Sequence, residues 1–306
     1  MIKYTLNRIG IGLLTIFVLI TVVFFLMKVL PGGPFDTDRV RDPRVMEIIL
    51  KNYNLDKPTH IQYLLYLQNL VKGDLGTSFK KTGTPVASLI VNLAPVTMRL
   101  GGVALLFSII MGLSLGIIAA LTRSEWIRAS IVGLATMGIS IPGFLMAIFL
   151  IYTFAVNLRF LPVIGLSTWK HYIMPSVALS FYPVAFISRM TRSILTEVLK
   201  QDYIVMAKSK GLSKLTIILR HALKNVLIPI VTYLGPLIAG LMTGSFVIEN
   251  LFAIPGIGRE LVAAIQGRDY PVIVGLTIFI GAFIVLMNLL ADLALGLVDP
   301  RIKVNS

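Results

Sequence analysis

The stretch IGIGLLTIFVLITVVFFLM, residues 9–27, contains no charged side chain. A bilayer core is crossed by about 20 apolar residues in helical form, so this run is long enough to span it once. The run is too long for the apolar region of a signal peptide, and Pro31-Gly32-Gly33-Pro34 follows it in place of a small-residue cleavage site. We therefore expect a retained membrane helix.

Further charge-free runs follow at residues 100–122, 129–158, 171–188, 225–248 and 270–291. The chain of 306 residues is 56% hydrophobic and 14% charged, whereas an average soluble domain has about 25% charged residues. These features predict an all-α polytopic membrane protein with six transmembrane helices, folded as a single domain over residues 1–306.

The basic residues are unevenly shared between the loops that join these runs. The formal net charge is +14, and short cytoplasmic loops of membrane proteins are enriched in Lys and Arg. The segment 189–224 contains eight basic residues but only Glu197 and Asp202 as acidic ones. If the runs alternate in direction, it lies on the same side as the segments that contain Lys3, Arg8, Arg123, Arg128, Arg301 and Lys303. We expect this side to be the cytoplasm, with both termini there, and we expect no nucleic-acid partner.

The segment 31–95 is then an extracytoplasmic helical insert. Asp42 and Pro43 form a typical helix start, because Asp caps the first turn and Pro fits the first helical position. A second helix is expected from about Pro58 to Gly73, where glycine provides the stop.

Residues 252–271, FAIPGIGRELVAAIQGRDYP, are too polar to cross the membrane between the last two runs. We expect a short helix over about 259–266 at the outer surface, introduced by the flexible Gly256 and Gly258. The pattern does not indicate a dinucleotide site, because no strand precedes it and no third glycine follows at the required spacing.

Proline interrupts several of the membrane runs. Pro142 lies near the middle of the third run, where it removes a backbone hydrogen bond, so the helix should kink or break there. The sequence leaves open whether this is a packing kink or a hinge in a substrate path. The candidates for a pathway or hinge are Pro142, Gly143, Pro229, Pro236, Pro255 and Gly256.

The basic segment AKSKGLSKLTIILRHALKN, residues 207–225, has the pattern of two short helices joined at Gly211. Asp202 can cap the first helix and Ser213 the second. An apolar face is expected from Leu215, Ile218, Leu219, Ala222 and Val226, and a basic face from Lys214, Arg220, His221 and Lys224, with Ile217 breaking the pattern. Such a segment could lie on anionic lipid or dock into a groove on a soluble partner.

Residues 202–236, DYIVMAKSKGLSKLTIILRHALKNVLIPIVTYLGP, resemble the cytoplasmic EAA loop of ATP-binding-cassette (ABC) importer permeases. The likeness is to the oligopeptide, dipeptide and nickel branch, and most of all to the B-type oligopeptide permease subunit. It covers nearly the whole chain through LPGGPF, GDLGTSF, SIPGFL, ISRMTRSILTEVL, FAIPGIG, RDYPVI and DPRI. One departure is that Val205-Met206-Ala207 stands where the family has Glu-Ala-Ala.

This resemblance implies the type I importer permease architecture and a place in the inner membrane. The chain would form half of a pathway for oligopeptides delivered by an extracytoplasmic binding protein, beside a second homologous permease and membrane lipid. Two ATP-binding subunits would bind ATP and Mg²⁺, and the chain itself would have no catalytic, metal or cofactor site. The ATPase-coupling residues would be Asp202, Tyr203, Ala207, Lys208, Gly211, Leu212, Arg220 and His221.

Other functions remain open at this stage. Dipeptide or nickel transport fits the same resemblance, while an ion-coupled secondary transporter would need an ionisable residue within a membrane run. Asp292 is the strongest such candidate, and we expect it to be a cap or a structural partner. The sequence contains no phosphate-binding loop and no cysteine, and His60, His171 and His221 lack the spacing of helical metal ligands, which disfavours an enzyme.

Overall fold

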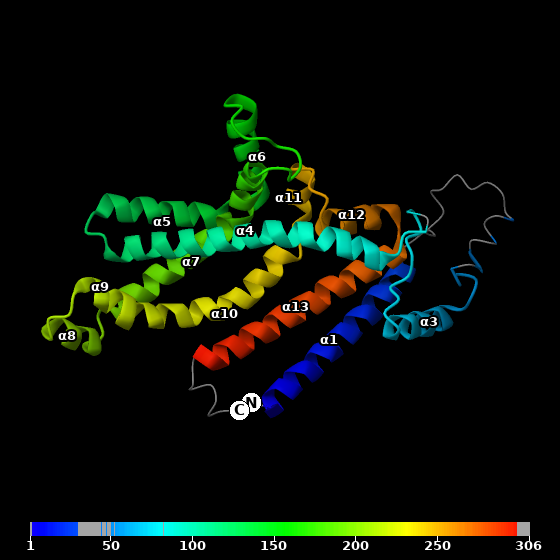
Figure 1. Ribbon diagram of the computed structural model, residues 1–306, viewed down its shortest axis with the longest axis horizontal. Helices are drawn as coiled ribbons and strands as arrows, with labels where there is room; N and C mark the ends of the chain where they lie inside the picture. Colours follow the sequence, from blue (N-terminus) through cyan, green and yellow to red (C-terminus); the bar gives the residue numbers. More distant parts are fainter. Residues whose placement is uncertain are drawn as a thin grey trace.

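Figure 1 shows the computed structural model of the protein, which describes residues 2–29, 44, 47, 50, 51, 53–81 and 83–298. All regular secondary structure in these ranges is helical, so the expected all-α fold is confirmed. The helix start expected at Asp42 and Pro43 lies outside the described residues, and so does the LPGGPF motif at residues 30–35. The elements are α1 Ile2–Val29, α3 Thr59–Val71, α4 Val86–Leu121, α5 Glu125–Ser140, α6 Gly143–Leu150, η1 Ile151–Asn157, α7 Trp169–Val198, α8 Asp202–Ser209, α9 Lys214–Thr216, η2 Ile217–Ala222, α10 Leu223–Met242, α11 Phe246–Leu251, α12 Ile257–Gly267 and α13 Tyr270–Val298.

The membrane segments agree with the charge-free runs. Five stretches are long and apolar enough to cross a bilayer, namely Leu6–Val29, Val86–Leu121, Trp169–Val198, Lys214–Leu251 and Tyr270–Ala294. The sixth is a bent pair, Glu125–Ser140 with Gly143–Asn157, whose two halves meet at 109°. The third predicted run is therefore a sharply bent, broken segment, and the fifth is interrupted only at residues 243–245, between α10 and α11.

The break lies at the proline expected to cause it. Ile141 has an extended backbone, as a residue before proline prefers, and Pro142 is the N-cap of α6. By contrast, Pro229 and Pro236 lie inside α10, which continues through both. The effect of Pro142 was predictable, whereas the prolines of α10 do not end their helix.

The centre of the molecule is the contact between α4 and α7, which cross in Figure 1. A Cβ atom on Gly112 would lie 2.7 Å from the Cβ atom of Ile187, and one on Gly116 would lie 2.5 Å from that of Thr191. Both positions require glycine because any side chain would separate the helices, a device common in membrane helix pairs. The close approach of α4 to α7 fixes the frame on which α5 and α10 pack.

The insert contains the second expected helix. It is α3, and Gly73 follows it with φ +80°, which confirms the predicted stop. The membrane helix α4 begins at Val86, so the last part of the expected insert, residues 86–95, belongs to that helix. At 36 residues, α4 is about 54 Å long, well beyond a bilayer core of about 30 Å.

Candidate functional site

The basic segment folds as a helix, a tight turn and a second helix. Gly211 has φ +76°, which confirms the left-handed turn, and the Ser213 hydroxyl accepts a hydrogen bond from the N–H of Thr216 at 3.2 Å, which confirms its capping role. The prediction that Asp202 caps α8 is wrong. Gln201 holds the N-cap position and Asp202 is the first helical residue, where its negative charge still favours the positive end of the helix.

The second helix has a different apolar face from the one predicted. Leu215 and Leu219 are 66% and 56% exposed, while Ile217, the residue that broke the pattern, is buried. The cause is the π-helix η2, because its hydrogen bonds join residues five apart and so place more residues in each turn. Ile218, Ala222 and Val226 are buried as expected, and Lys214, Arg220, His221 and Lys224 are exposed as expected.

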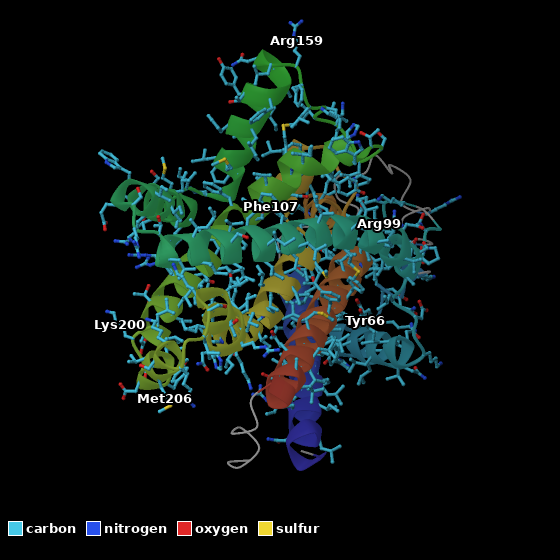
Figure 2. All side chains as sticks on the ribbon, turned by 60° about the vertical axis from the view of Figure 1, so that its left-hand side comes forward. Tyr66, Arg99, Phe107, Arg159, Lys200 and Met206 are labelled. Carbon is cyan, nitrogen blue, oxygen red and sulfur yellow. The ribbon has the colours of Figure 1, made fainter. Side chains whose placement is uncertain are left out.

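This helix–turn–helix presents a mixed surface to its surroundings. We call the exposed side chains of its apolar and basic residues the coupling surface: Tyr203, Val205, Met206, Lys208, Lys210, Leu212, Lys214, Leu215, Leu219, Arg220, His221 and Lys224. Figure 1 shows α8 and α9 at one extremity of the molecule, and Figure 2 shows Lys200 and Met206 together at that edge. Exposed apolar and basic side chains on one projecting element suit docking to a partner.

The opposite side of α8 holds it to the rest of the chain. Ile204 and Ala207 are buried in a cluster that also contains Leu195 and Ala222. The hydroxyl of Tyr203 accepts a hydrogen bond from the side-chain amide of Asn225 at 2.6 Å. Ala207, one of the expected ATPase-coupling residues, is therefore packed against this chain itself, and these contacts hold α8 in place.

An apolar groove of about 420 Å³ lies between α6, α7, α10 and α11. Gly143 at the start of α6 and Pro236 of α10 both line it, so two of the candidate pathway residues come together here. Tyr182 and Tyr233 form part of its wall, and the ring of Phe186 lies 4.5 Å from that of Tyr233 between centroids. Pro142 adjoins this groove at the break, whereas Pro229, Pro255 and Gly256 do not line it.

The FAIPGIG motif surrounds a buried carboxylate that sequence reasoning missed. Glu249 is 1% exposed, and its carboxylate accepts hydrogen bonds from the Thr97 hydroxyl at 2.9 Å and the Arg259 N–H at 2.8 Å. A Cβ atom on Gly256 would overlap this carboxylate, although Gly256 has an ordinary φ of −115°. Glycine is required at position 256 because the Glu249 carboxylate leaves no room for a side chain. The expectation that Gly256 serves as a flexible lead into the helix is therefore wrong. The sequence signal that could have indicated this arrangement is an acidic residue, Glu249, on the N-terminal side of the Gly256-Ile257-Gly258 pattern.

The expected surface helix is α12, Ile257–Gly267, which is slightly longer than predicted. It begins at the Glu249 carboxylate, and Ile257 and Ala264 are buried against its neighbours. At the far end of the molecule, Asp292 forms an ion pair with Arg8 of α1 at 3.0 Å, as expected of a structural partner. The described part of the chain brings together no group of three His, Cys, Asp or Glu side chains suited to a metal ion.

These features define a polytopic α-helical membrane protein with an exposed basic and apolar projection at one end and an apolar groove between its helices. The chain belongs to the family of inner membrane components of binding-protein-dependent transport systems, whose profile matches residues 112–304. The profile of the N-terminal region of such membrane components matches residues 1–101. The resemblance seen in the sequence is thus confirmed.

The chain is similar to named permeases along its whole length. It is 45% identical over 305 residues to the dipeptide transport system permease protein DppB of Bacillus subtilis, covering 100% of this chain and 99% of that protein. It is 41% identical over 305 residues to the oligopeptide transport system permease protein OppB of Escherichia coli, covering 99% of this chain and 100% of that protein.

A solved structure supports the fold. A chain of the MetNI methionine ABC transporter, in an inward-facing conformation, matches with a TM-score of 0.55 and 20% identity, covering 70% of this chain and 97% of that one. The type I importer permease architecture is therefore confirmed.

Proposed function

We propose that this chain is the permease subunit of an ATP-driven importer of peptides and forms half of its translocation pathway. The coupling surface carries this proposal, because a rigid, basic and apolar projection at one end of a membrane bundle is suited to receive force from a soluble partner. Relatives named as dipeptide and oligopeptide permeases support a peptide substrate.

The proposed partners follow from the absence of a phosphate-binding loop in the sequence and from the exposed coupling surface and groove. ATP and Mg²⁺ would bind to two ATPase subunits, because the sequence contains no phosphate-binding loop. A second homologous permease would supply the other half of the pathway and face the groove between α6, α7 and α10. An extracytoplasmic binding protein would deliver the peptide to the opposite side of the membrane.

The groove suits a substrate with varied side chains. Its wall includes Phe144, Leu179, Val247 and Ile248, together with two tyrosines, and it contains no charged residue. Such a surface contacts the peptide without selecting a sequence, so selection falls to the binding protein. Dipeptides are the second candidate substrate, since the similarity to a dipeptide permease is as extensive as that to the oligopeptide permeases.

The test is to assemble the full chain with a second permease and both ATPases, and to measure how much ATPase co-purifies and how much peptide enters proteoliposomes. Leu219→Asp places a charge on the exposed apolar part of the coupling surface, and we expect it to reduce ATPase association. Val71→Asp is the matched control, because Val71 is 89% exposed on α3. Equal ATPase recovery with both variants would contradict the proposal.

A further inference from the structure

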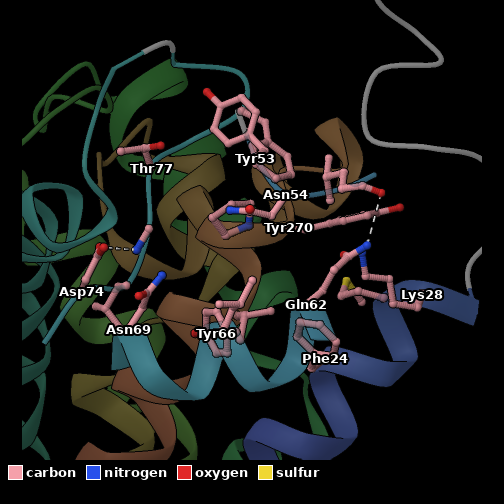
Figure 3. Close-up of a pocket in the computed structure, with 18 residues that line it drawn as sticks. Phe24, Lys28, Tyr53, Asn54, Gln62, Tyr66, Asn69, Asp74, Thr77 and Tyr270 are labelled. Atoms are coloured by element: carbon pink, nitrogen blue, oxygen red, sulfur yellow. Dashed lines mark hydrogen bonds between the residues drawn. The ribbon is translucent and has the colours of Figure 1, made fainter. Parts of the chain in front are cut away.

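A second cavity lies among residues of α1, α3 and α13 (Figure 3). In Figure 1, α3 lies at the opposite end of the molecule from α8 and α9. The volume of the cavity is about 290 Å³, near the lower limit of about 300 Å³ for small-molecule sites. The rings of Phe24, Tyr53, Phe79 and Tyr270 form much of its wall. Aromatic walls of this kind bind apolar side chains and cations.

One side of the cavity is positively charged. The ammonium group of Lys28 donates a hydrogen bond to the side-chain oxygen of Gln62 at 2.5 Å and lies 5.7 Å from the ring centroid of Phe24. Lys28 is half-buried, and no described carboxylate forms an ion pair with it. A partly buried ammonium without a counter-ion favours binding of a ligand carboxylate, because the new ion pair offsets its loss of hydration.

The other side of the cavity carries a carboxylate. Asp74 accepts a hydrogen bond from the N–H of Gly76 at 2.8 Å, which orients its side chain, and it has no ion-pair partner within the described ranges. Figure 3 shows Asp74 and Lys28 on opposite sides of the cavity with Tyr66 between them. They are separated opposite charges that do not neutralise each other.

Tyr66 supplies an unused hydrogen-bonding group. Its hydroxyl oxygen is buried and has no hydrogen-bond partner among the described residues. Burial, and then the charge of Asp74, raise the pKa of Tyr66, so the hydroxyl stays protonated and can donate. Buried polar groups are normally satisfied, so this hydroxyl is available to a polar group of a ligand in the cavity.

We propose that the cavity binds a small zwitterion, an amino acid or a dipeptide, with its carboxylate on Lys28 and its ammonium group on Asp74. The aromatic wall takes the apolar side chain, and the volume of about 290 Å³ suits a ligand of this size. This site is separate from the groove lined by Gly143 and Pro236, and it is not needed for the proposed import function. Its occupancy can therefore be measured without transport.

The test uses the full chain alone, in nanodiscs of phosphatidylcholine, with radiolabelled Leu-Ala as the probe in equilibrium dialysis. We expect saturable binding that weakens about tenfold when the probe is N-acetylated or C-amidated, since each change removes one ion pair worth about 1.4 kcal/mol. Lys28→Met should weaken binding of free Leu-Ala equally but leave binding of the amide unchanged. Asp74→Asn should do the same for the acetylated probe.

Two control variants show whether the effect of removing a charge is specific to the cavity. Lys72→Met and Asp56→Asn remove exposed charges that do not line the cavity, and they should leave binding unchanged. The blocked probes test the wild-type chain even if a variant fails to fold. Absence of saturable Leu-Ala binding, or equal binding of free and blocked probes, overturns the proposal. Binding of added phosphatidylglycerol that depends on Lys28, without Leu-Ala binding, would also overturn it and assign the cavity to a lipid headgroup.

Discussion

The carboxylate of Glu249 occupies the space that a side chain on Gly256 would need. The same carboxylate accepts a hydrogen bond from the N–H of Arg259 in the first turn of α12, so it holds the start of this helix in place. Thr97 of α4 joins the arrangement by donating its hydroxyl to Glu249 and accepting the N–H of Ile257 at 2.9 Å. Three elements thus meet at a single buried acid.

Gly256→Ala should therefore destabilise the protein. The added methyl group displaces a buried carboxylate, and a buried polar group that loses its partners costs about 1–3 kcal/mol. The measurement is thermal unfolding of the purified chain in detergent. Gly267→Ala is the matched control, because its new methyl group would have only Lys80 in ordinary contact at 3.7 Å. Identical melting of the two variants would contradict this account.

Asp269→Ala should release the loop before α4. Asp269 is buried and accepts hydrogen bonds from the hydroxyl of Ser78 and from the N–H of Phe79 at 3.0 Å. Removing the carboxylate leaves these donors unpaired, so hydrogen exchange in residues 76–86 should become faster. Ser88→Ala, which removes only an exposed hydrogen bond to Pro85, should leave exchange unchanged. Unaltered exchange in Asp269→Ala would show that the loop is held by other contacts.

The sequence predicted the features that depend on composition and local chemistry. Charge-free runs located the membrane segments because a bilayer requires a fixed apolar length, and Pro142 located the break because it lacks an N–H. The shift of apolar face at Ile217 was missed, because a π-helix is selected by the contacts of Ile217 and Ala222 with the rest of the core. The Glu249 arrangement was missed because Thr97 is 152 residues away.

The membrane orientation can be tested by labelling. The sequence contains no cysteine, so a single introduced cysteine reports its own position. Ser213→Cys, in the exposed turn before α9, should react with a membrane-impermeant maleimide only from the cytoplasm, and Lys72→Cys, in the exposed turn after α3, only from outside. Reaction of both positions from the same side would refute the proposed topology.

Asp292→Asn distinguishes an ATP-driven importer from an ion-coupled transporter. Asp292 pairs with Arg8, and both side chains are partly exposed, so loss of the pair should lower the free energy of unfolding by no more than about 1 kcal/mol. We expect ATP-dependent uptake to persist in the assembled complex. Abolished uptake with normal folding and assembly would favour a coupling-ion site. Arg8→Gln, which breaks the same pair, is the control.

The last prediction concerns the turn between α8 and α9. Gly211 has φ +76°, and nothing lies within 4 Å of the position of a Cβ atom, so a side chain is disfavoured by backbone conformation alone within this chain. Asn tolerates this conformation, whereas Ala and Val carry a penalty of about 1 kcal/mol or more. We therefore expect Gly211→Asn to retain coupling of ATP hydrolysis to uptake, Gly211→Ala to weaken it and Gly211→Val to weaken it most.

Gly83 provides the matched control for this series. It has the same φ of +76° and the same open surroundings, but it lies in the loop before α4, far along the chain from the coupling surface. Gly83→Val should introduce similar backbone strain and leave coupling intact. The measurement is receptor-stimulated ATPase activity beside peptide uptake in the assembled complex. Normal coupling in Gly211→Val would show that the turn geometry is dispensable. Loss of coupling in Gly211→Asn as well would show that a partner touches the glycine itself, because the turn is then preserved and only the added side chain differs.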